Sequence, residues 1–220
     1  MPCYMAKANL KGDETMHRIT SLIRAIAPGL LLMTFMACAT NAPSRFFVLS
    51  SLTGPAGGTE MAGDGRNLTI GVGPVEFPAY LDRQEIVTRV SANELHLAGF
   101  NEWAEPLKDN FTGVLVENLS VLLSKDLFTI FPFRGPEPID YQVRVEVIRF
   151  DGNLGGDASL FVRWIVFGED DKKIFLTKKS AFKEATGGPD YKALVAAQSR
   201  TVEALSREIA GAIKGLSGAR

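Results

Sequence analysis

The feature that most constrains the fold is a run of three β-strand patterns between residues 141 and 182. In the first pattern apolar and polar residues alternate, so one face of the strand is buried and the other is hydrated. Its apolar positions are Tyr141, Val143, Val145 and Val147. Residues 160–167 are almost continuously apolar, as in a strand inside a sheet. Residues 174–182 form a third pattern, in which Lys178 and Lys179 favour an exposed edge. Together they predict a β-meander.

The remaining sequence adds shorter strand patterns and two amphipathic helices. Strands are predicted at residues 46–50, 68–77, 86–90, 94–98 and 128–131, and a glycine-rich loop at residues 54–65. Apolar residues recur at helical spacing after Pro106, and again from Tyr191 to Ile213. The element order is two strands, a hairpin, a helix, a strand, the β-meander and a final helix. This order predicts the mixed α/β class, as a single domain with helices packed on the sheet.

The N-terminal region has the pattern of a secretory signal peptide. An apolar run at residues 25–36 follows Arg18 and Arg24 and precedes small residues. The run is too short for a membrane-spanning helix, which needs about 20 residues. The pattern starts most naturally at Met16, so residues 1–37 are interpreted as an upstream extension plus the signal peptide. Residues 38–45 then form a tether, and residues 46–216 form the domain.

Cys38 stands where bacterial lipoprotein signals place the cysteine that is acylated, with Ala37 before it. Phe35 and Met36 depart from the usual residues of such signals. The alternative is an incidental cysteine at the end of an ordinary signal peptide. The sequence therefore predicts that Cys38 carries an acyl anchor, which attaches the mature chain to a membrane.

Composition and motifs argue against catalysis and against nucleic-acid binding. The 220 residues carry a net charge of −1, and losing residues 1–37 removes four basic and two acidic residues, which leaves −3. No phosphate-binding loop or nucleophile elbow is present, and His96 is interpreted as a residue on the surface of a sheet. Four aspartates are interpreted as solvated turn residues rather than calcium ligands: Asp151, Asp157, Asp170 and Asp171. We expect no cofactor, no metal and no enzyme activity.

Three segments together resemble a known family. They are residues 46–49 (FFVL), 72–89 (VGPVEFPAYLDRQEIVTR) and 100–107 (FNEWAEPL). Asp140, Tyr141, Phe150, Asp151 and Trp164 fit the same pattern. The sequence is similar to the ABC-transport auxiliary lipoproteins, the PqiC or YmbA-like lipoproteins of Gram-negative bacteria. The resemblance covers nearly all of the chain after Cys38.

Ala39 follows Cys38, where aspartate would retain a lipoprotein in the inner membrane, so we expect the periplasmic face of the outer membrane. The resemblance itself implies a periplasmic lipoprotein. It implies an accessory role in intermembrane lipid transport, by docking an MCE-domain protein and, indirectly, an ABC permease and ATPase. It also implies a fold like the amino-terminal domain of TolB. Two rival functions stay open, a periplasmic lipid carrier with its own apolar cavity and a periplasmic hydrolase, as does assembly into a homo-oligomer.

The second and third of these segments contain a candidate partner surface. We define it as Tyr80, Leu81, Asp82, Arg83, Arg89 and Trp103. Tyrosine, tryptophan and arginine are favoured anchors at protein interfaces. The structural alternative is that Tyr80 and Trp103 pack, while Asp82 holds Arg83 or a backbone amide. Glu105 precedes the first helix, where a carboxylate meets the positive end of the helix dipole.

Overall fold

The described part of the chain forms eight strands and two long helices, in two sheets. This computed structural model describes residues 43–53, 68–123, 127–133, 138–168 and 173–218. The strands are β1 (Arg45–Phe47), β2 (Thr69–Glu76), β3 (Glu85–Ser91), β4 (Glu94–Trp103), β5 (Leu127–Ile130), β6 (Tyr141–Gly152), β7 (Asp157–Gly168) and β8 (Ile174–Ala185). The helices are α2 (Leu107–Leu122) and α3 (Tyr191–Ser217), with a short 3-10 helix, η2 (Ala79–Leu81). The predicted signal peptide, Cys38 and the loop at residues 54–65 lie outside the described residues.

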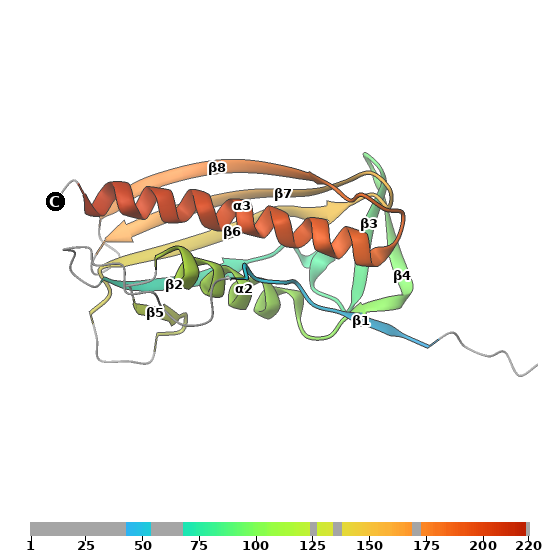
Figure 1. Ribbon diagram of the computed structural model, residues 1–220, viewed down its shortest axis with the longest axis horizontal. Helices are drawn as coiled ribbons and strands as arrows, with labels where there is room; N and C mark the ends of the chain where they lie inside the picture. The colour runs from blue at the N-terminus through green and yellow to red at the C-terminus, as the bar shows by residue number, and fades with distance from the viewer. Residues whose placement is uncertain (1–42, 54–67, 124–126, 134–137, 169–172, 219–220) are drawn as a thin grey trace, which may run out of the picture. The chain divides into compact units, whose positions relative to one another are not determined.

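The larger sheet has five strands in the order β5-β2-β6-β7-β8. Strands β5, β2 and β6 are parallel, whereas β6, β7 and β8 are antiparallel neighbours, so the sheet is mixed. The predicted β-meander is confirmed, with β7 in its interior and the lysine-bearing β8 at the edge. The mixed α/β class is confirmed as well (Figure 1).

The other three strands form a separate sheet in the order β1-β4-β3, whereas the sequence predicts one sheet. β3 and β4 are the predicted hairpin, but β4 continues to Trp103, beyond the predicted end at residue 98. The added length is paired with β1, which lies parallel to it with Phe47 opposite Trp103. Residues 99–102 have no strand pattern of their own, so this pairing with a distant segment decides their conformation.

The core lies between one face of the larger sheet and the two helices. Even-numbered residues of β7, among them Trp164, point toward α3 and are fully buried. Phe77, Phe111 and Phe150 meet edge to face, with ring centroids 5.3 to 6.4 Å apart, and join β6 to α2. Asp190 caps the N-terminus of α3, where its Oδ1 accepts a hydrogen bond from the Ala193 backbone amide at 2.7 Å.

Residues 49–52, here called the N-terminal strap, are bound to both helices by side chains. Three backbone amides of the strap donate hydrogen bonds to side-chain oxygens on α2 and α3. The donors are Leu49, Ser50 and Leu52, and their acceptors are Asn110, Ser199 and Asn118, at 2.7, 3.0 and 2.6 Å. Asn118 also donates to the Ser206 hydroxyl at 3.2 Å, so one buried amide connects the strap, α2 and α3.

Candidate partner surface

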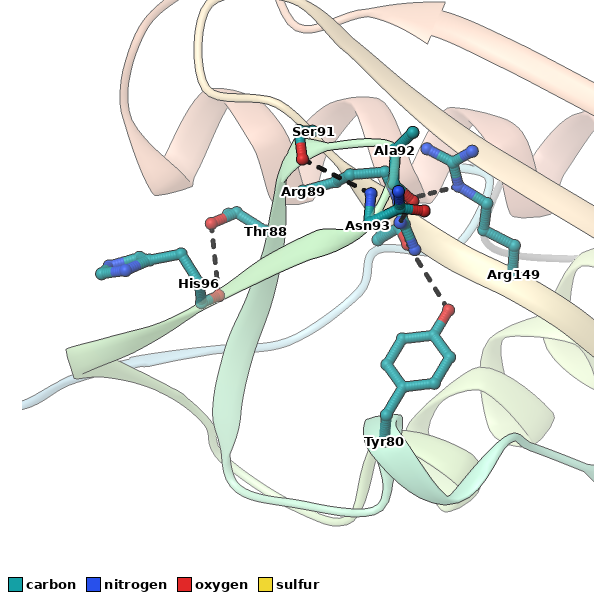
Figure 2. A network of polar contacts seen from close by, with 9 residues as sticks. Tyr80, Thr88, Arg89, Ser91, Ala92, Asn93, His96 and Arg149 are labelled. Atoms are coloured by element: carbon teal, nitrogen blue, oxygen red, sulfur yellow. Dashed lines mark hydrogen bonds and ion pairs between the residues drawn. The ribbon is translucent and has the colours of Figure 1, made fainter.

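A fully buried carboxylate, Asp151, organises the region around the candidate partner surface. Its side chain has an exposed fraction of 0%. Arg89 donates to its Oδ2 from Nη2 at 2.7 Å and from Nε at 3.0 Å. Arg149 donates to Oδ1 from Nε at 2.6 Å, and the Tyr80 hydroxyl donates to Oδ2 at 3.4 Å. We call these four residues the Asp151 cluster; Figure 2 labels its tyrosine and both arginines.

The prediction that Asp151 is a solvated turn residue is wrong. It lies near the end of β6, which packs against β3 of the smaller sheet. Arg149 and Asp151 are two residues apart, so their side chains share one face of the strand. Arg89 comes from β3 and also donates to the Ala92 carbonyl in the hairpin turn at 3.1 Å. The cluster therefore connects the two sheets through one buried carboxylate and two partly buried arginines.

The cluster changes the ionisation of its members. The hydrogen bond to Asp151 raises the pKa of the Arg89 guanidinium, so this cation stays charged. Burial, reinforced by the negative charge of Asp151, raises the pKa of the Tyr80 hydroxyl. Arg149 also stacks over the Phe161 ring, 5.4 Å from its centroid. The arrangement is a structural ion-pair network, because two cations and a neutral phenol enclose one carboxylate.

The raised pKa of Tyr80 predicts a loss of stability in alkali. A tyrosine in an unfolded chain ionises at about pH 10. The folded protein holds the hydroxyl proton of Tyr80 more tightly. The contribution is complete below that pH and is lost as the pH rises through the native pKa, because the unfolded state loses its proton first. We expect the free energy of unfolding to fall above about pH 10. Tyr80→Phe should remove the part of this decrease that comes from ionisation of Tyr80. Urea titrations across that range measure it. A Tyr191→Phe variant, changed outside the cluster, should retain the decrease, and an unaltered profile in Tyr80→Phe would contradict the assignment.

The structure separates the six residues of the candidate partner surface into three pairs. Leu81 and Trp103 are core residues, exposed by 2% and 4%. Tyr80 and Arg89 belong to the Asp151 cluster. Asp82 and Arg83 are exposed. The turn after η2 is fixed by backbone bonds, from the Asp82 amide to the Ala79 carbonyl at 3.2 Å and from the Arg83 amide to the Leu81 carbonyl at 2.9 Å.

An open groove of about 380 Å³ lies beside this turn, between η2 and α2. Its lining residues are Glu76, Phe77, Ala79, Leu81, Asp82 and Lys108. Leu81 and Phe77 supply an apolar floor, while Asp82 and Lys108 place opposite charges at the rim. Such a mixed lining fits a protein segment better than a lipid chain, which needs a mostly apolar site.

Two residues of the Asp151 cluster, Asp151 and Arg149, were missed as site residues by the sequence reasoning. The available signal was the resemblance, which includes Phe150 and Asp151 but assigns them no role. His96 is exposed on β4, as predicted. The Glu105 carboxylate accepts a hydrogen bond from Nδ2 of the Asn110 side chain at 2.6 Å. It therefore orients the side chain whose Oδ1 binds the strap at Leu49.

Within the described residues, no group of three or more histidine, cysteine or acidic side chains is arranged to hold a metal ion. Among the helices in the described part of the chain, none has both the length and the apolar character needed to cross a membrane.

Comparison with known proteins identifies the family. The model of the ABC-type transport auxiliary lipoprotein component matches residues 51–210. No curated protein sequence matches this chain. Two solved structures have the same fold, each covering 78% of this chain and 99% of their own. One is the crystal structure of an uncharacterized protein, with 20% identity and a TM-score of 0.64. The other is a Xanthomonas campestris protein of the family DUF330, with 16% identity and a TM-score of 0.61. Because the family model spans well over half of the sequence, the chain belongs to the ABC-type transport auxiliary lipoprotein family.

Proposed function

We propose that this protein is a lipid-anchored accessory lipoprotein of an intermembrane lipid-transport system, which docks an MCE-domain partner at the periplasmic face of the outer membrane. Its family is an auxiliary component of ABC-type transport in the bacterial envelope, which is not a known class of enzyme. The anchor is the predicted acyl group on Cys38. The docking segment is the turn that follows η2, together with the groove beside it.

The observation that carries this proposal is the contrast between the two sides of η2. On the inner side, Leu81 is buried and Tyr80 contacts the carboxylate of Asp151, so the segment has little freedom. On the outer side, Asp82 and Arg83 are exposed next to the groove. A rigid segment that presents exposed side chains loses little conformational entropy when a partner binds. This arrangement supports docking, whereas a carrier would require an enclosed apolar cavity.

The proposal predicts that Arg83→Ala weakens the association and leaves the fold intact. Losing an interface arginine costs about 2 kcal/mol, or roughly thirtyfold in affinity. Recovery of the MCE-domain partner with the protein from cells measures the association, and the melting temperature of the purified variant reports the fold. Arg207→Ala is the matched control, because Arg207 is an exposed arginine on α3 that pairs with Glu203.

Two results would count against this role of Arg83. A native melting temperature with undiminished recovery of the partner removes Arg83 from the interface. A strongly lowered melting temperature of the Arg83→Ala variant indicates instead that the Arg83 side chain stabilises the turn.

A further inference from the structure

The sheet that follows the predicted anchor exposes aromatic side chains. Five of the twelve exposed large apolar residues in the described chain lie in the three-stranded sheet or directly after β1. They are Phe46, Val48, Val90, Leu97 and Phe100. Phe46 is 63% exposed, Phe100 46% and Val48 51%. Isolated exposed apolar residues are common, but a group of them indicates a contact surface.

Three of these residues lie on, or directly after, the paired strands β1 and β4. In the parallel pairing of β1 with β4, Phe46 lies opposite Glu102. Phe100 is two residues before Glu102 on β4, in the stretch where the pairing of β4 with β3 shifts register, and its side chain is exposed like that of Phe46. Ser44, two residues before Phe46, donates its hydroxyl to the Glu102 carboxylate at 3.2 Å, which holds the start of β1 against β4. Val48 is exposed directly after β1. We call Phe46, Val48 and Phe100 the apolar patch.

The length of chain between the patch and Cys38 decides what can cover it. Cys38 lies seven residues before Arg45, and a fully extended chain of that length spans at most about 24 Å. If Cys38 is acylated, the patch therefore stays close to the surface of the bilayer that holds the acyl chains. Aromatic side chains are favoured at the boundary between lipid headgroups and acyl chains. A short tether also raises the local concentration of the membrane surface around the patch.

We infer that the apolar patch is a second membrane contact, in which Phe46, Val48 and Phe100 enter the headgroup region of the bilayer and orient the domain on it. This inference rests on the proposed acyl anchor at Cys38. The anchor restricts the distance of the domain from the membrane, and the patch determines which side faces it. Each phenylalanine removed should lower the ratio of docked to free domain about fivefold, because burying roughly half of a phenylalanine side chain gives that gain.

Lipid quenching of a single fluorescent label tests the contact. The mature chain contains no cysteine besides Cys38, whose sulfur is blocked when acylated, so one introduced cysteine can be labelled alone. The acylated protein, purified from membranes, is placed in phosphatidylethanolamine and phosphatidylglycerol vesicles that contain brominated phospholipid. Labels at Phe100→Cys and, separately, Val48→Cys should be quenched. Control labels at the exposed Ala181 and Ala196, on β8 and α3, should not be.

Further variants separate an apolar contact from an electrostatic one. Adding Phe46→Ser to the Phe100→Cys protein should lower its docked-to-free ratio about fivefold. High salt should leave the quenching unchanged, since it screens charges. Quenching that disappears at high salt would overturn an apolar contact.

The remaining outcomes are equally decisive. A vesicle-bound protein with unquenched labels at both positions overturns the patch and leaves the anchor in place. Crosslinking of the patch to a second copy, without quenching, assigns it to an interface between copies and overturns the inference. A protein that separates from the vesicles overturns the acyl anchor, and this contact with it.

Discussion

Asp151→Ala should lower the free energy of unfolding by about 3 kcal/mol, because it removes the carboxylate of a buried ion pair. The change leaves Arg89 and Arg149 facing each other without the carboxylate that neutralises them. Their side chains are 18% and 29% exposed, so they recover part of their hydration, which places the loss at the lower end of the range for a broken buried ion pair. Urea unfolding followed by tryptophan fluorescence measures it, since the chain has two tryptophans, both in the core.

Arg163→Ala provides the comparison for this loss. Arg163 pairs with Glu146 on the same sheet, but both side chains are more than one third exposed. Breaking an exposed pair costs less than about 1 kcal/mol. Equal losses in Asp151→Ala and Arg163→Ala would show that burial of the Asp151 cluster contributes little to stability.

Cys38→Ala should abolish attachment of the protein to the membrane. We expect labelled palmitate to mark the normal protein in cells and to be absent from the variant, because the thiol of Cys38 is the predicted acceptor of the lipid. The variant should appear in the soluble periplasmic fraction. A mildly acidic chain has no electrostatic attraction to anionic lipid, and the apolar patch alone provides only weak binding.

Cys3→Ala is the control for this experiment, since Cys3 lies before the predicted start at Met16 and should not affect the label. Ala39 follows Cys38, where aspartate would retain a lipoprotein in the inner membrane, so the normal protein should fractionate with the outer membrane. Palmitate labelling that persists in Cys38→Ala would refute the anchor, and exclusive recovery in the inner membrane would refute the outer-membrane location.

The sequence predicted the elements whose patterns are local. α3 is long and amphipathic and has an aspartate cap, and β6, β7 and β8 each carry their own strand pattern. The division into two sheets was not predictable in this way. The end of β4 is a strand because β1 pairs with it, and residues 99–102 give no sign of this. Local patterns cannot reveal a pairing between segments more than 50 residues apart.

The same limit applies to the candidate site. An aspartate near a glycine usually indicates a turn, and Asp151 precedes Gly152. Its burial depends on Arg89, which lies 62 residues away on another sheet. The short segment around η2 was identified from its residue types, but these do not distinguish the inward Tyr80 and Leu81 from the outward Asp82 and Arg83. That distinction follows from the direction of one turn of 3-10 helix.

The N-terminal strap makes the start of this domain depend on its last helix. Ser50 is synthesised early, yet its acceptor Ser199 lies 149 residues later in the chain, on the last helix. A ribosome builds the chain from its N-terminus, so the strap emerges long before the surface that holds it. The Ser50 amide can meet its acceptor only once α3 has been made, whereas the acceptors of the Leu49 and Leu52 amides lie on α2. The segment nearest to the predicted anchor is therefore held in full only when the last helix is present.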